Sequence, residues 1–293
     1  MSDKEEHNSC ASGDSDARLK LQDQLISSTL AQIRYKLFVM SGKGGVGKSS
    51  VAVNAAAALA LSGYKVGLMD VDLHGPSAAR LLGLTGQLEV DRGSLVKPKR
   101  YSDNLHVVSM DSLLENPDTA VLWRGPMKTS AIRQFISDVN WGDLDFLVVD
   151  SPPGTGDEPM TVLKTIPEAL CVVVTTPQEI SLADVRKAIN FLQYAQANTL
   201  GLVENMSGLV CPHCGETIDL FKRDGGRRLA EKYGLDFLGA IPLDPNTVVA
   251  ADRGMPVVLW EGDTAAKQAF LKLGERLAEA AFSSLEAAAS THT

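Results

Sequence analysis

The feature that most constrains this chain is a glycine-rich loop between an apolar segment and a helix-forming segment, within residues 35–63. The loop is Gly42-Lys43-Gly44-Gly45-Val46-Gly47-Lys48-Ser49, and it fits the pattern G-x4-G-K-[ST] of phosphate-binding loops. Glycines without a Cβ let consecutive backbone N–H groups surround phosphate oxygens, and the dipole of the following helix favours the same anion. The loop therefore predicts a nucleotide-binding site that follows a buried strand.

Three side chains in and near this loop have expected roles with the nucleotide. Lys48 is expected to place a positive charge at the β- and γ-phosphates, and the hydroxyl of Ser49 is expected to bind Mg²⁺. Asp150 follows four apolar residues, and an acid at that place in a nucleotide-binding sheet holds the same Mg²⁺ through water. The next residues, 151–157, contain Pro-Pro-Gly-Thr-Gly and are predicted to be a switch that responds to the third phosphate.

A second pair of acids follows another apolar segment. Asp70 and Asp72 are two residues apart, so on a continuing strand both side chains would point to one face of the sheet. One of them can then lie near the metal and the other near an attacking water. The chain has no Asn-Lys-x-Asp sequence that would recognise guanine, which favours ATP over GTP.

Apolar segments alternate with amphipathic ones, as in a doubly wound, mostly parallel α/β sheet with helices on both faces. Strands are predicted at residues 37–40, 65–72, 105–110, 146–150, 169–175, 199–204 and 237–241. Helices are predicted at residues 17–34, from the loop to Gly63, and at 125–139, 181–198 and 264–289. Ser181 and Asp184 are expected to form a capping box. Residues 1–16 lack periodicity and are predicted to be a disordered arm, and residues 17–293 to be a single domain.

Composition and charge argue against several classes of protein. The formal charge is −8, with 28 basic residues against 36 acidic ones, so there is no electrostatic case for nucleic acid. No run approaches the roughly 18 apolar residues of a membrane span, and the polar, acidic N-terminus is unlike a secretory signal. These features predict a cytoplasmic protein without a membrane or nucleic-acid partner.

Cys211-Pro212-His213-Cys214-Gly215 is a second candidate site. Two thiolates at this spacing converge on one metal, but structural zinc normally needs four ligands and the chain has no second pair. Cys171 lies in an apolar segment and is predicted to be a core residue, and Cys10 to be an incidental thiol. Spacing alone leaves three interpretations open: a redox dithiol, an unliganded turn, or one metal or iron–sulfur site to which two chains each contribute a pair.

Several motifs together resemble one family. Lys43 gives the loop the additional lysine found in the MinD/ParA and nitrogenase-iron-protein group, and the rest of the chain resembles the Mrp/ApbC iron–sulfur cluster carrier ATPases over about residues 20–275. The motifs that carry this resemblance are DVDLHGPS (70–77), WRGPM (123–127), DSPPGTGDE (150–158), TPQE (176–179), ENMSG (204–208) and CPHCGE (211–216).

The resemblance implies a homodimer that sandwiches ATP, binds a [4Fe–4S] cluster and transfers it to apo iron–sulfur proteins, with cluster-assembly factors as further partners. It implies that Lys43 reaches the nucleotide of the partner, that Asp72 positions the attacking water and that Asn205 contacts the adenine. It also implies that Cys211 and Cys214 hold the cluster together with the pair from the partner.

Hydrolysis is expected to be slow, because one monomer lacks a complete set of transition-state groups. Ser50 replaces the threonine usual in the family and keeps the hydroxyl. Cytosolic eukaryotic relatives have an N-terminal site of four cysteines, where this chain has Cys10 alone.

The alternative interpretation is a nucleotide-switched positioning ATPase of the MinD/ParA kind, in which the cysteines are incidental or bind zinc. Such a protein needs a membrane-binding helix or a basic DNA-binding surface. Residues 261–293 contain three basic residues against several acids and form no basic face. A reductase like the nitrogenase iron protein is also disfavoured, because that protein takes its cysteines from two separated segments.

Overall fold

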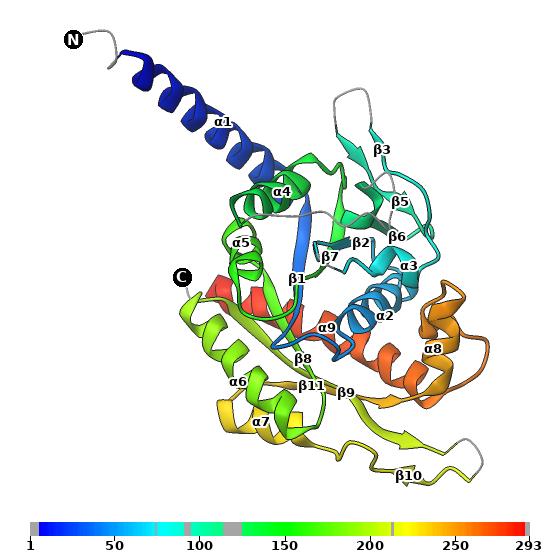
Figure 1. The fold of residues 1–293 in the computed structure, drawn as a ribbon. Helices are drawn as coiled ribbons and strands as arrows, with labels where there is room; N and C mark the ends of the chain where they lie inside the picture. The colour runs from blue at the N-terminus through cyan, green and yellow to red at the C-terminus, as the bar shows by residue number, and fades with distance from the viewer. Residues whose placement is uncertain (1–5, 74, 91–94, 114–124, 212–213, 291–293) are drawn as a thin grey trace.

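The computed structural model describes residues 6–73, 75–90, 95–113, 125–211 and 214–290 and is shown in Figure 1. His74, Trp123, Arg124, Pro212 and His213, which belong to the motifs above, lie outside these ranges, as do residues 1–5 of the predicted arm.

Strands and helices alternate along most of the chain. The strands are β1 (Ile33–Ser41), β2 (Val66–Asp70), β3 (Glu89–Val90), β4 (Val96–Lys97), β5 (Lys99–Arg100), β6 (Leu105–Ser109), β7 (Leu144–Asp150), β8 (Leu170–Thr175), β9 (Asn198–Val210), β10 (Thr217–Ile218) and β11 (Phe237–Leu243). The helices are α1 (Glu6–Ala31), α2 (Lys48–Leu61), α3 (Ala78–Leu81), α4 (Gly125–Asp138), α5 (Asp157–Thr165), α6 (Glu179–Tyr194), α7 (Gly225–Tyr233), α8 (Pro245–Asp252) and α9 (Ala265–Ser290), with 3₁₀ turns at Met110–Leu113 and Val257–Leu259.

Nine strands form the central sheet in the order β10-β9-β8-β1-β7-β2-β6-β5, with β11 also paired to β9. All neighbours are parallel except the edge strands β10 and β5. The order places β7 between β1 and β2, so Asp150 is in register with both Val39 and Asp70. The doubly wound α/β fold predicted from the alternation is therefore confirmed, and its crossovers bring the ends of β1, β2 and β7 together.

Each face of the sheet packs against its own layer of helices (Figure 1). Leu37 and Val39 of β1 point into a core shared with α2 and α9, while Phe38 and Met40 point into a core shared with α1, α4, α5, α6 and α7. This alternation along one strand is the period-2 pattern of side chains, and burial on both faces explains why β1 is apolar throughout its second half.

The predicted helices are present, but two of their starts differ from expectation. Helix α1 begins at Glu6, so residues 6–16, predicted to be disordered, are helical. Those residues contain no proline and a single glycine, so nothing in them ends a helix that the more apolar residues 17–31 stabilise. The predicted capping box is wrong: α6 starts at Glu179, and the hydroxyl of Ser181 lies buried, 2.6 Å from that of Thr176.

The structure also contains elements that the pattern did not predict: α5, α7, α8, β10 and the short strands between α3 and β6. Strand β9 was predicted to end at Glu204 but continues to Val210 and turns into β10. No helix within the described ranges is long and apolar enough to cross a bilayer.

Candidate functional site

The phosphate loop lies between the end of β1 and the start of α2, and two of its glycines are required by close packing. A Cβ at Gly42 would lie 2.4 Å from the carbonyl oxygen of Asp184 in α6. Gly47 has a φ of +78°, and a Cβ there would lie 2.2 Å from the side-chain nitrogen of Asn205. The loop is thus held between α6 and β9, with Gly44 and Gly45 exposed to solvent.

Lys48 and Asp150 form a buried ion pair at the base of this loop. The ammonium of Lys48 contacts Oδ1 of Asp150 and donates to the hydroxyl of Ser49 at 3.3 Å, and the two charged side chains are 6% and 0% exposed. Burial raises the pKa of Asp150, and Lys48 opposes that rise. The sequence predicted that these three residues would meet, and they do.

One oxygen of this ion pair has no partner. Oδ2 of Asp150 is buried and accepts no hydrogen bond from any residue that the structure describes. A buried carboxylate oxygen beside a serine hydroxyl is the type of oxygen donor set that Mg²⁺ prefers. The residues present therefore fit the magnesium expected to accompany the nucleotide.

Asp70 has hydrogen-bond partners that its position two residues before Asp72 did not indicate. Its carboxylate is fully buried and already accepts four hydrogen bonds, from the backbone N–H groups of Asp72 (3.1 Å), Ser77 (2.8 Å) and Ala78 (3.0 Å) and from the hydroxyl of Ser109 (3.2 Å). Burial, and then the charge of Asp150, raise the pKa of Asp70 to about 7. Asp70 therefore holds the loop after β2 in place, and both of its carboxylate oxygens accept hydrogen bonds from the chain.

Asp72 lies beyond the end of β2, on the loop that Asp70 anchors. Its side chain is 8% exposed, and its Oδ1 accepts a hydrogen bond from the N–H of Gly75 at 3.2 Å. Asp70 and Asp72 thus differ in their contacts: Asp70 anchors the loop after β2, and Asp72 lies on that loop.

Lys43 and Ser50 lie at the two ends of the loop region. The carbonyl oxygen of Lys43 accepts a hydrogen bond from the hydroxyl of Ser41 at 2.8 Å, while its half-buried ammonium has no partner among the described residues. Ser50 lies in the first turn of α2, where its carbonyl oxygen accepts a hydrogen bond from Asn54 at 2.9 Å.

The segment predicted to be a switch is tied to the end of β1 by its backbone. The N–H of Ser151 donates to Val39 O at 3.1 Å, and that of Gly154 donates to Ser41 O at 2.9 Å. Glu158, just after the segment, forms an ion pair of 2.7 Å with Lys128 of α4. The sequence did not predict this link, because Lys128 and Glu158 are 30 residues apart and share no local pattern.

Asn205 lies against the phosphate loop from the other side. Its side-chain amide donates to the carbonyl oxygen of Val46 at 2.9 Å, and the residue is 8% exposed. Strand β9 therefore touches the loop directly. The resemblance assigned Asn205 to the adenine, and the contact with Val46 is an additional interaction that the sequence did not indicate.

Cys211 and Cys214 lie in the turn between β9 and β10. The N–H of Cys211 donates to Glu216 O at 2.8 Å, and the N–H of Gly215 donates to Cys211 O at 2.9 Å. Cys214 is exposed and Cys211 is half-buried. No group of three or more metal-ligating residues occurs in the described part of the chain.

Cys171 differs from this pair in every respect. It is fully buried in β8, and burial raises the pKa of its thiol to about 12. The prediction that it is a core residue is confirmed.

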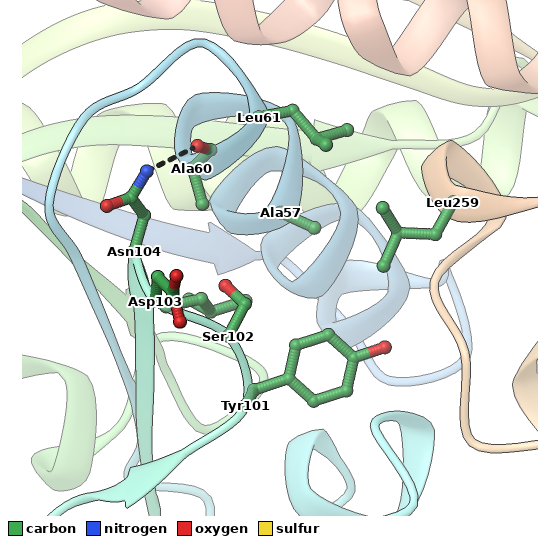
Figure 2. Close-up of a pocket in the computed structure, with 9 residues that line it drawn as sticks. Ala57, Ala60, Leu61, Tyr101, Ser102, Asp103, Asn104 and Leu259 are labelled. Atoms are coloured by element: carbon green, nitrogen blue, oxygen red, sulfur yellow. Dashed lines mark hydrogen bonds between the residues drawn. The ribbon is translucent and has the colours of Figure 1, made fainter.

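The structure also contains a separate cavity at the other end of α2. This cavity of about 390 Å³ is bordered by Ala57, Ala60 and Leu61 of α2, by residues 101–105 and by Leu259, and Figure 2 shows these side chains around it, with the amide of Asn104 donating to Ala60 O at 3.4 Å. None of the predicted site residues lines it, and it does not belong to the nucleotide site.

A family model described as "ParA: NUBPL iron-transfer P-loop NTPase" matches residues 32–278. The chain is 44% identical over 262 residues to an iron–sulfur cluster carrier protein of Methanocaldococcus jannaschii, covering 89% of this chain and 90% of that protein. It is 47% identical over 231 residues to a cytosolic Fe–S cluster assembly factor NUBP2 homolog of Dictyostelium discoideum, covering 76% of this chain and 86% of the relative.

The chain is also similar to solved structures. A nucleotide-binding protein of Archaeoglobus fulgidus in complex with ADP superimposes with a TM-score of 0.72 at 38% identity, over 82% of this chain and 94% of that one. The cell-division ATPase MinD of Pyrococcus furiosus superimposes with a TM-score of 0.62 at 23% identity, over 84% and 98% of the two chains, which shows a shared fold alone.

Proposed function

Because the chain belongs to the family of NUBPL-type iron-transfer P-loop NTPases, we propose that it is an ATP-dependent carrier that holds an iron–sulfur cluster and transfers it to apo-proteins. The observation that carries this proposal is that one strand, β9, touches the phosphate loop through Asn205 and continues into the turn that holds Cys211 and Cys214. A protein that only hydrolyses ATP has no need of a thiol pair on the strand that contacts its phosphate loop.

The nucleotide part of the proposal depends on the phosphate loop, residues 42–50. The backbone N–H groups of the loop and of the first turn of α2 bind the phosphates, and Lys48 moves from Asp150 toward the β- and γ-phosphates when these arrive. Ser49 and Asp150 are the residues that would hold Mg²⁺, and the bound ion would neutralise charge on the phosphate oxygens. Release of Lys48 from Asp150 frees a second carboxylate oxygen for that purpose.

The hydrolytic part depends on Asp72 and on a second copy of the chain. Asp72, on the loop held by Asp70, positions the attacking water, and Lys43 from the partner compensates the charge that develops on the phosphates. The unpartnered ammonium of Lys43 supports this assignment, since a lysine already paired within its own chain would not be available. Hydrolysis that requires a partner is slow in the isolated chain.

The cargo part depends on the two thiols and on the same homodimer. One chain supplies two thiolates, so a four-thiolate [4Fe–4S] site needs a pair from each copy. Val210, Ile218 and Leu220 around the turn are 36%, 47% and 54% exposed, which supports an apolar contact at this place. Apo iron–sulfur proteins and cluster-assembly factors are then the partners, in the cytoplasm.

The test is anaerobic reconstitution with iron and sulfide, followed by metal analysis, a visible spectrum and a mass measurement of the assembly. The wild-type chain is expected to be a dimer with about four iron and four sulfide per dimer. The double variant Cys211→Ala/Cys214→Ala is expected to bind neither, whereas Cys171→Ala is expected to match wild type. A double variant that retains iron and sulfide, or a loaded monomer, would contradict the proposal.

A further inference from the structure

Glu204 is a buried acid for which the proposed function above gives no role. It is 0% exposed and lies in β9, paired with Thr175 of β8 on one side and Ala240 of β11 on the other. A buried carboxylate is costly unless hydrogen bonds or charges compensate it. Its surroundings therefore indicate what holds it there.

Three donors from the two sides of one segment surround this carboxylate. Its Oε1 accepts from the hydroxyl of Ser207 at 2.5 Å and from the N–H of Asp224 at 3.0 Å, and its Oε2 accepts from the N–H of Gly226 at 2.5 Å. Ser207 lies just after Glu204, whereas Asp224 and Gly226 lie at the start of α7. Glu204 thus joins the beginning and the end of residues 205–224, here called the cysteine hairpin.

The base of the cysteine hairpin is strained. Met206, Lys222 and Asp224 have φ values of 56°, 70° and 59°, a left-handed conformation that costs energy in residues other than glycine. Such conformations persist where the surrounding contacts impose them. The hydrogen bond from the N–H of Asp224 to Glu204 is one such contact, and Glu204 also lies at the positive end of the α7 dipole.

The neighbour of Glu204 along the strand is Asn205, which donates to Val46 O of the phosphate loop. Two consecutive residues therefore form hydrogen bonds with two different segments: Asn205 with the phosphate loop and Glu204 with the base of the cysteine hairpin. Cys211 follows six residues after Asn205, at most about 20 Å away at the rise of an extended strand. A shift of the phosphate loop would reach the thiols through this short connection.

We propose that Glu204 is a positioning residue that fixes the cysteine hairpin on the end of β9, so that the state of the phosphate loop is transmitted to Cys211 and Cys214. This inference rests on the proposed function, because it assumes that the thiols hold cargo. It predicts that Glu204 affects how the thiols respond to nucleotide rather than how tightly nucleotide binds.

The test uses the reactivity of the thiols in the full-length, cluster-free protein. Alkylation of Cys211 and Cys214 by iodoacetamide is followed by peptide mass spectrometry, with and without ATP and Mg²⁺. The buried Cys171 should stay unmodified in the folded protein and therefore serves as a control for unfolding. In wild type, nucleotide is expected to change the rate about threefold or more. In Glu204→Gln, the alkylation rate of the two thiols is expected to rise about tenfold and to lose its dependence on nucleotide. The reason is that the amide NH₂ group of glutamine is a hydrogen-bond donor and would face the donors that surround the carboxylate in wild type.

The matched control is Glu216→Gln, which makes the same change at an exposed side chain in the same hairpin. It is expected to behave as wild type, and ATP affinity is expected to stay within about twofold in both variants. The inference is overturned if wild-type thiols react equally with and without ATP, or if Glu204→Gln retains the wild-type response. The assay needs no iron, so its failure is distinct from a failure to bind a cluster.

Ser207→Ala gives a second, milder test should Glu204→Gln not fold. It removes one of the three donors and leaves the carboxylate in place. The nucleotide response of the thiols is expected to fall by about half, with an unchanged circular dichroism spectrum. A full wild-type response in a folded Ser207→Ala protein would count against the inference.

Discussion

The nucleotide site and the cysteine hairpin are built in opposite ways. Lys48 and Asp150 are buried where the ends of the central strands β1, β7 and β2 come together. Two glycines of the phosphate loop pack closely against α6 and β9. Cys211 and Cys214 lie at the edge of the sheet in a turn held by two backbone hydrogen bonds, and Cys214 is exposed to solvent.

The difference lies in what each site lacks. The nucleotide site has its lysine, hydroxyl and carboxylate within one chain, and a single buried oxygen remains without a partner. The hairpin has two thiols, half the number that the proposed four-thiolate site needs. The nucleotide site, built from buried side chains of one chain, suits a small ligand that binds in the core. The exposed turn with its two thiols suits a cargo that other proteins deliver and remove.

The largest effect is expected for Lys48→Ala, which should impair the nucleotide site and leave the cysteine hairpin intact. Removing the ammonium is expected to reduce ATP hydrolysis about 10³-fold, because no other described cation contacts Asp150, while iron and sulfide binding stays intact. Hydrolysis is measured by phosphate release and the cluster by its absorption. Lys48→Arg is a parallel variant that keeps the charge beside Asp150, and Lys164→Ala, on the exposed face of α5, is the control. Normal hydrolysis in Lys48→Arg would show that the position requires charge alone.

Lys43→Ala asks whether the nucleotide site is complete within one chain. It is expected to lower hydrolysis about 10²-fold with little change in ATP affinity, because the ammonium touches no described group of its own chain. The sharper measurement is complementation between Lys43→Ala and Asp72→Asn chains, each inactive alone. If Lys43 acts on the partner, an equal mixture regains about a quarter of wild-type activity, since half of the dimers contain one complete site. No recovery in a mixture shown to form mixed dimers would place Lys43 in its own site.

The sequence predicted those parts of both regions that depend on local pattern. The loop, Lys48 and Asp150 follow from a motif and from strand ends, because parallel strands bring their carboxyl ends to one edge of the sheet. Cys171 follows from an apolar segment. These are features in which residues close in sequence carry the whole signal.

What the sequence did not predict depends on partners far along the chain. Asp70 has the same spacing to Asp72 whatever it binds, and its role became apparent only from Ser77, Ala78 and Ser109, the last of which lies 39 residues away. Ser181 matches a capping box, yet α6 starts two residues earlier, and the Ser181 hydroxyl pairs with Thr176, a local contact that the pattern also did not indicate. Glu204 was noted as part of a motif, but two of its donors lie at the start of α7, a helix that the sequence pattern did not predict. Gly234, at the end of α7, was the signal that could have indicated this helix.

Asp70 should make stability of the nucleotide-free protein depend on pH. Between its ordinary pKa of 3.8 and its raised pKa of about 7, the native state keeps a proton that the unfolded chain has lost. The stabilisation is therefore full below the lower value and is lost as pH rises through about 7, so the melting temperature should fall by roughly 2 °C from pH 6 to pH 8. Asp70→Asn, which cannot titrate, should show a smaller fall, and the exposed Asp252→Asn should match wild type. An equal fall in Asp70→Asn would assign the dependence to other groups.

The smallest effect is expected at Cys171. It tests whether this buried thiol contributes only to stability while the pair in the cysteine hairpin binds iron. At pH 8 the thiol of Cys171 is protonated and buried, because burial raises its pKa to about 12, so iodoacetamide should not modify it in the folded protein. Cys171→Ala should cost about 1 kcal/mol of stability through the small cavity it leaves and should bind as much iron as wild type. Cys211→Ala/Cys214→Ala should show the reverse, with unchanged urea unfolding and no iron. Iron loss in Cys171→Ala, or alkylation of Cys171 at the rate of Cys214, would mean that the core near β8 opens far more readily than its packing indicates.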